Sequence, residues 1–161
     1  MAGSSWDWGW DTHGTDHDGS IDMGLRNKCR TIDRPMTALL LDLKQRGLLE
    51  ETLVVWGGEF GRTPMQENRE GKKMGFLGRD HHVDAFTMWM AGAGVKPGAY
   101  GSTDDIGYYI AEDKVGIRDL QSTILHQLGL DPQRFSFPYQ GLDQRLIGPT
   151  TDGKVISDIL T

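Results

Sequence analysis

Two short apolar runs, TLVVW at residues 52–56 and AFTMWMAG at residues 85–92, limit the folds that this chain can adopt. Neither run alternates strictly between apolar and polar residues, so each is typical of a strand covered by helices on both faces. Apolar residues spaced by three and four over residues 22–46 and 117–130 predict helices. We therefore expect an α/β fold whose mixed, mostly parallel sheet is flanked by helices.

Glycine and proline residues refine this expectation. Pro35 lies inside the pattern of residues 22–46, where it predicts a kink or two abutting helices. Gly47 and Gly129 are expected just beyond the ends of the two helices, because glycine adopts positive φ there without strain. Residues 57–84 are rich in Gly, Arg, Lys and Glu, and a connection of that length is usually functional or mobile.

Composition excludes several classes of protein. A net charge of −6, without a basic stripe, argues against a nucleic-acid partner. No apolar run reaches the length of a membrane span, and the start of the sequence shows no signal-peptide pattern. The single cysteine, Cys29, excludes a disulfide framework and a cysteine-based zinc site, and its place on an apolar helical face predicts a core position.

The histidines cluster with carboxylates in two places, WDTHGTDHDG at residues 10–19 and GRDHHVD at residues 78–84. Four of the five histidines lie within two residues of an aspartate: His13, His17, His81 and His82. Imidazole nitrogens and carboxylate oxygens together suit a divalent cation, zinc first, with manganese and calcium as alternatives. Asp11 and His13 are two residues apart, so in an extended turn both side chains can reach one ion.

The stretch VVWGGEFGRTP at residues 54–64 follows the first apolar run. Ligands of α/β proteins bind just beyond the carboxyl ends of strands, which makes Glu59 a candidate metal ligand. Arg62 could bind a phosphate or sulfate group through two parallel hydrogen bonds, or it could simply pair with Glu59 in a tight turn.

The triplet Asp80-His81-His82 supplies the remaining candidates. Neighbouring side chains of an extended segment point to opposite sides, so we expect one histidine to be a metal ligand together with Asp80, and the other to orient a ligand or contact substrate. Arg79 is a further candidate for binding an anion. If these histidines meet Glu59 at one sheet edge, the strand at 86–91 must run antiparallel to the strand at 52–56.

The stretches LLLDLKQRGLLEETLVVWGGEFGRTP, GRDHH and WMAGAGVKPGAYGSTDDIG resemble the bacterial sulfatase-like proteins of the DUF1501 family. The resemblance runs from about Trp6 to the end of the chain. It implies membership of the alkaline phosphatase superfamily, with residues 1–161 as a single domain that forms the C-terminal part of a longer sulfatase-like domain. The nucleophile of the superfamily and the aspartate of its first strand would then precede this sequence.

The resemblance also implies roles for individual residues. The superfamily's Asp…His metal pair corresponds to Asp11 and His13, with His17 as a rival for the second position. In the Ser-Asp-His-Gly stretch of the superfamily, Glu59 takes the place of the aspartate and Phe60 that of a ligating histidine. The final histidine ligand corresponds to His81 or His82.

Taken together, these patterns predict a metal-dependent hydrolase of small phosphate or sulfate esters. The metal ligands would be Asp11, His13, Glu59, Asp80, His81 and His82, and the anion-binding residues Arg62 and Arg79. The alternative is a truncated, non-catalytic relative, in which the metal stabilises a module that binds an anion or a partner. We further expect either self-association or pairing with an N-terminal portion, and the resemblance implies the periplasm or cell envelope.

Overall fold

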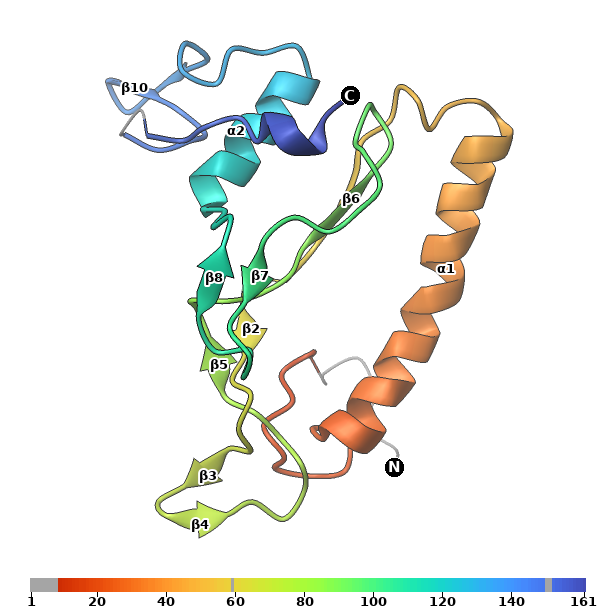
Figure 1. Ribbon diagram of the computed structural model, residues 1–161, viewed down its shortest axis with the longest axis vertical. Helices are drawn as coiled ribbons and strands as arrows, with labels where there is room; N and C mark the ends of the chain where they lie inside the picture. Colours follow the sequence, from red (N-terminus) through yellow and green to blue (C-terminus); the bar gives the residue numbers. More distant parts are fainter. Residues whose placement is uncertain (1–8, 59, 150–151) are drawn as a thin grey trace. The chain divides into compact units, whose positions relative to one another are not determined.

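The computed structural model describes residues 9–58, 60–149 and 152–161, which belong to two compact units (Figure 1). The described part of the first unit consists of residues 9–46, Gly57–Met88 and Thr103–Tyr109. The second unit consists of Gly47–Trp56, Trp89–Ser102 and the described residues from Ile110 onwards. Both units are therefore assembled from segments that are distant in the sequence.

The long helix of the first unit begins with a π-helical turn, η1 (Ile21–Leu25), and continues as α1 (Arg26–Gln45). The buried Ser20 caps it, because its hydroxyl accepts hydrogen bonds from the Met23 and Gly24 amides. α1 is a single helix with Pro35 inside, so the expectation of two abutting helices is wrong. The loss of one backbone hydrogen bond at Pro35 does not divide a helix of this length.

Two antiparallel pairs of short strands complete the first unit. β2 (Gly61–Arg62) pairs with β5 (His81–His82), and β3 (Asn68–Arg69) pairs with β4 (Lys72–Lys73). Glu70 and Gly71 join β3 to β4 with φ values of 52° and 73°, which suit the right-handed twist of a two-residue hairpin. The connection 57–84 is thus a set of hairpin-like strands and not one long loop.

The second unit contains the apolar runs and the C-terminal helix. Its strands and helices are β1 (Val54–Trp56), β6 (Trp89–Ala91), β8 (Ile110–Glu112), α2 (Ile117–Gln127), β9 (Phe137–Tyr139), β10 (Leu142–Gln144) and η2 (Ser157–Ile159). β1 and β6 are antiparallel, which confirms the expected direction of the two apolar strands. β9 pairs with β10, and β8 with β7 (Ser102–Thr103).

The expected mostly parallel sheet of an alkaline-phosphatase-like fold is wrong. The described residues form two-stranded sheets, and the pairs β1–β6, β2–β5, β3–β4 and β9–β10 are all antiparallel. Parallel neighbours need a crossover connection, usually a helix, but the described residues between β1 and β6 form no helix. The two predicted helices are present, and Gly47 and Gly129 follow them with φ values of 70° and 75°, as expected.

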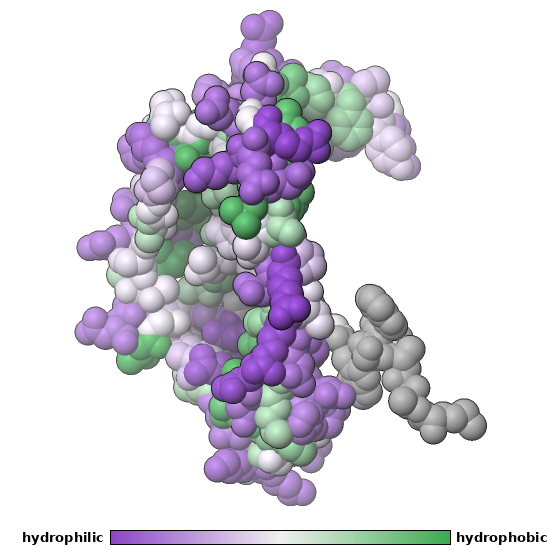
Figure 2. All heavy atoms as spheres, turned by 90° about the vertical axis from the view of Figure 1, so that its right-hand side faces the viewer, coloured by the Kyte–Doolittle hydropathy of each residue, from purple (hydrophilic) through white to green (hydrophobic). Residues whose placement is uncertain are grey.

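Apolar side chains are less buried than the sequence suggests. Of the described residues, the buried apolar ones are Ala85, Leu125 and Ile147, and α1 buries none of its side chains. Val55 and Trp56 of β1 are exposed, so the prediction that this strand is covered on both faces is wrong, and so is a core position for Cys29. Green apolar side chains accordingly appear among purple hydrophilic ones on the surface in Figure 2. Over the described residues, neither helix combines the length and apolar character that crossing a bilayer requires.

Candidate metal centre

Backbone hydrogen bonds within the first unit align three segments that are far apart in the sequence. The Arg79 amide donates to the Thr12 carbonyl at 3.1 Å, and the Glu67 amide donates to the Gly78 carbonyl at 2.9 Å. The segment 78–82 therefore lies between the N-terminal loop and the segment that leads into β3. Thr12 is 2% exposed, which shows how closely these segments pack. This alignment sets the positions of all the side chains described next.

Gly78 makes the close approach of the two loops feasible. A Cβ atom at this position would lie 1.9 Å from the carbonyl carbon of His13 and 2.1 Å from the Gly14 amide nitrogen. These neighbours are backbone atoms and cannot yield as the end of a flexible side chain would. Only glycine therefore allows the segment 78–82 to lie against residues 12–14.

We expect Gly78→Ala to lower the free energy of unfolding by about 1–3 kcal/mol, the usual cost of overpacking. Gly75→Ala is the matched control, because a Cβ atom at Gly75 meets nothing within 4 Å. Urea denaturation of both variants measures the difference. Equal midpoints for Gly78→Ala and the wild type would contradict the described contact.

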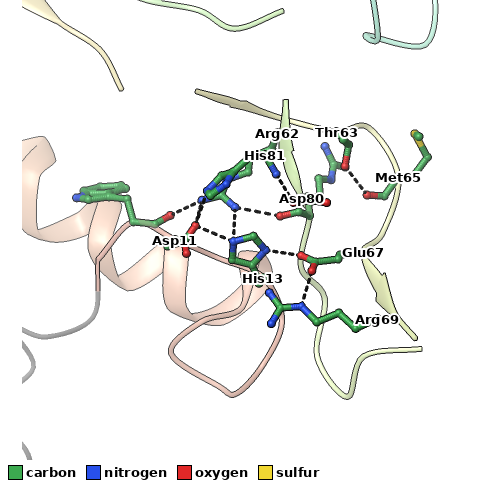
Figure 3. A network of polar contacts seen from close by, with 11 residues as sticks. Asp11, His13, Arg62, Thr63, Met65, Glu67, Arg69, Asp80 and His81 are labelled. Carbon is green, nitrogen blue, oxygen red and sulfur yellow. Dashed lines mark hydrogen bonds and ion pairs between the residues drawn. The ribbon is translucent and has the colours of Figure 1, made fainter. Parts of the chain in front are cut away.

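Two imidazole rings converge on one carboxylate oxygen (Figure 3). Asp11 Oδ1 lies 2.8 Å from His13 Nε2 and 2.7 Å from His81 Nε2. The centres of the two rings are 4.9 Å apart and their planes are nearly perpendicular. The His13 side chain is 12% exposed, whereas those of His81 and Asp11 are more open to solvent. One nitrogen of each ring and one carboxylate oxygen thus lie close enough together to contact a single ion.

Arg62 lies beside this cluster because β2 and β5 pair in register. Arg62 is the cross-strand partner of His81, and its Nη2 donates to Asp11 Oδ1 at 2.7 Å. Its Nη1 donates to the Arg79 carbonyl at 3.0 Å. The guanidinium group therefore neutralises the carboxylate on which the two imidazoles converge.

The pKa of Asp11 reflects these neighbours. Partial burial acts to raise the pKa, but the hydrogen bonds from Arg62 and His81, together with the positive field of His13 and Arg62, lower it to about 2. Asp11 is consequently a carboxylate at neutral pH, which is the form that binds a cation.

His82 points the other way from its neighbour. The His82 side chain is buried, its Nε2 forms a hydrogen bond with the Tyr108 carbonyl, and its ring centre lies 4.5 Å from that of Tyr108. This arrangement follows from the alternation of side chains along a strand. His82 thus fastens the segment Thr103–Tyr109 to β5 and takes no part in the cluster around Asp11.

The far side of His13 contacts a second carboxylate. His13 Nδ1 forms a short hydrogen bond with Glu67 Oε2, and Arg69 Nε donates to Glu67 Oε1 at 2.6 Å. The Glu67 side chain is 8% exposed. Burial acts to raise the pKa of Glu67, but the hydrogen bonds from Arg69 and His13 lower it below its usual value. Both nitrogens of His13 therefore face ionised carboxyl groups.

The residues around Asp11 fit a metal ion. Asp11, His13 and His81 each offer one ligand atom, and these atoms lie within 4.8 Å of one another. Ligands of a tetrahedral zinc ion, bound at about 2.0–2.1 Å, lie about 3.3 Å apart. The present contacts of 2.7 and 2.8 Å would have to widen by only about half an ångström. Two nitrogens and one oxygen suit zinc or manganese and not calcium, which prefers oxygen ligands.

Comparison with protein families gives a match over most of the chain. The model of a family described as protein of unknown function (DUF1501) matches residues 4–160. The chain belongs to the DUF1501 family. Neither the curated proteins nor the solved structures compared with it gave a match.

In this DUF1501 chain the structure brings together three of the six residues expected at the metal. Asp11, His13 and His81 meet, whereas His17 forms its contact with its neighbour Asp18, at 3.2 Å. Asp80 lies within ligand distance of His13 and Glu67 but not in the group formed by Asp11, His13 and His81. Glu59 lies outside the described residues.

The two other residues predicted near the DUF1501 site can also be located. Phe60 packs its ring against His81, with the ring centres 5.2 Å apart. Arg79 is half-buried, and its guanidinium group has no hydrogen bond or ion pair within the described part of the chain.

Sequence analysis missed Glu67 and Arg69. Both occur in the charged segment between the apolar runs, where neither composition nor spacing to a histidine distinguishes them. One signal was present: the two residues are separated by a single residue, so in an extended strand their side chains lie on one face. The partner of that face, His13, is 54 residues away and depends on the pairing of three segments.

Proposed function

We propose that this DUF1501 protein is a metal-dependent hydrolase of small phosphate or sulfate esters, with zinc as its preferred ion. The observation that supports this proposal most directly is the convergence of His13 Nε2 and His81 Nε2 on Asp11 Oδ1, from segments about 70 residues apart. Three potential ligands leave positions on the ion for water or substrate, as in catalytic zinc sites. A bound ion would supply Lewis-acid charge and lower the pKa of a bound water molecule.

The chain's own residues have distinct roles in this proposal. Asp11, His13 and His81 would hold the ion, and Arg79 would bind a non-bridging oxygen of the ester. Arg62 contacts Asp11 through Nη2, so an ion at Asp11 competes with this guanidinium group. Once it is displaced, Arg62 could bind the same anionic group as Arg79. The remaining ligand candidates, Glu59, Asp80 and His82, are not required by the described geometry.

The second candidate function is a metal-stabilised module without catalysis. It is favoured by the surroundings of Thr63, whose hydroxyl donates to the Met65 carbonyl at 3.2 Å and is thus engaged within its own turn (Figure 3). Thr63 is therefore not poised to act as a hydroxyl nucleophile, so catalysis through such a side chain would need a residue from elsewhere. Hydrolysis by a metal-bound water molecule would not need a hydroxyl side chain at all.

Turnover of p-nitrophenyl phosphate and p-nitrophenyl sulfate tests the proposal. We expect zinc-loaded protein to hydrolyse at least one of them, EDTA to remove the activity, and added Zn²⁺ to restore it. His13→Ala should be inactive, and His126→Ala should retain full activity, because His126 is exposed on α2 in the other unit. Bound zinc without turnover of either ester would favour the module, and absence of zinc binding would contradict both functions.

A further inference from the structure

Glu67 is placed like a group that supports a metal ligand. Its nearly buried carboxylate uses both oxygens, Oε2 for His13 Nδ1 and Oε1 for Arg69 Nε. The backbone amide of Glu67 is itself held by the Gly78 carbonyl at 2.9 Å. The carboxylate is therefore fixed from two directions, by its own backbone and by the guanidinium group of Arg69.

This contact determines which nitrogen of His13 is available. A carboxylate accepts hydrogen bonds only, so the proton between Glu67 and His13 belongs to Nδ1. The other nitrogen, Nε2, lies 2.8 Å from Asp11 Oδ1 and is therefore the one that an ion would occupy in place of a proton. Histidine ligands of metals commonly donate their other N–H to a carboxylate, which fixes the orientation of the ring and makes it a stronger ligand.

Glu67 could also be interpreted as a ligand, because His13, Glu67 and Asp80 form a second group with closely spaced ligand atoms. Its contacts argue against this interpretation. A cation on Glu67 would have to displace the Arg69 guanidinium group from Oε1 or the imidazole from Oε2. One oxygen of Asp80, Oδ1, already accepts a hydrogen bond from the His81 amide at 2.8 Å.

We propose that Glu67, fixed by Arg69, is a positioning residue that keeps the proton of His13 on Nδ1 and directs Nε2 toward the cation site. This inference rests on the proposed metal centre and adds an outer layer to it, formed by residues that do not touch the ion. It follows that the β3–β4 hairpin, which carries Arg69, contributes to the affinity for metal.

The test compares Glu67→Ala, Glu67→Gln and Glu70→Gln in the full chain. Glu70 is an exposed carboxylate in the same hairpin, which makes Glu70→Gln the matched control. The dissociation constant for Zn²⁺ is measured by competition with a chromogenic chelator. We expect Glu67→Ala to weaken binding by roughly 10–100-fold, Glu67→Gln to lie between Glu67→Ala and the wild type, and Glu70→Gln to be unchanged.

A second readout follows the proton directly. Nitrogen-15 NMR of the imidazole groups, with His13 assigned by its loss in His13→Asn, should show a protonated Nδ1 in both the metal-free and the zinc-loaded wild type. It should also show zinc on Nε2, and a mixture of ring forms in metal-free Glu67→Ala. Glu67→Gln keeps a hydrogen-bond acceptor, so it remains informative if Glu67→Ala does not fold.

The outcomes separate this inference from the proposed function. A wild type that binds zinc while both Glu67 variants keep its affinity would overturn the inference alone, and so would zinc on Nδ1 of His13. A wild type that binds no zinc would overturn the metal centre and, with it, the role assigned here to Glu67. Zinc binding with the expected losses but without ester turnover would support the inference and contradict only the hydrolase.

Discussion

Asp11→Asn is expected to weaken Zn²⁺ binding by more than 100-fold, beyond the roughly 10–100-fold effect of residues that only support a ligand. Asp11 Oδ1 is the one atom on which both imidazoles and the Arg62 guanidinium group converge. An amide retains an acceptor oxygen but loses the charge that holds a cation beside Arg62. Competition with a chromogenic chelator, at constant ionic strength, measures the loss.

Asp18→Asn provides a matched control for this experiment. Asp18 lies in the same loop, also contacts a histidine, and has a side chain that is 57% exposed, as is that of Asp11. If both variants weaken zinc binding equally, general loss of negative charge in the loop accounts for the effect. Unchanged affinity of Asp11→Asn would eliminate the proposed ligand set.

Replacing the adjacent His81 and His82 by alanine should give opposite results: one variant loses zinc affinity and the other loses stability. His81→Ala removes a proposed ligand from a half-exposed position, so we expect zinc affinity to fall at least 100-fold while stability of the metal-free protein changes little. His82→Ala empties a buried site and leaves the Tyr108 carbonyl without its partner, which should cost about 2–4 kcal/mol of unfolding free energy.

Two measurements on the same pair of variants check this separation. Urea denaturation of metal-free protein gives the stability, and chelator competition gives the zinc affinity under conditions in which each variant is folded. The expectation for His82→Ala is an affinity within about threefold of the wild type, because its imidazole faces away from Asp11. Loss of zinc affinity in His82→Ala and its retention in His81→Ala would reverse the assignment.

Local pattern predicted the helices well and the sheets poorly. The spacing of Ile117, Leu120 and Ile124 describes α2, and Gly129 ends it, because a helix is encoded by neighbours in sequence. The parallel sheet was inferred from apolar runs alone, which do not specify a partner strand. The antiparallel direction of β1 and β6 was predicted correctly from a different argument, the need to return residues 81–82 to the preceding strand's end.

The candidate site was predictable to the extent that its residues cluster in the sequence. Asp11 and His13 are two residues apart, and the His81-His82 pair follows Asp80, so composition alone marked both segments. Which member of a pair faces the site depends on strand register: the pairing of Arg62 with His81 places His81 beside Asp11. Glu67 could not be found in this way, because its place in the site depends on a contact with His13, which is distant in the sequence.

The separation of the proposed ligands along the chain has a consequence for how much folded protein a cell contains. An ion held by residues 11, 13 and 81 closes a loop of nearly seventy residues, which contains all of α1 and β1. If the proposed ion binds the folded form alone, the supply of metal determines in part how much of the chain is folded. Scarcity of the ion would then act through turnover of the polypeptide by proteases, even before any reaction was lost.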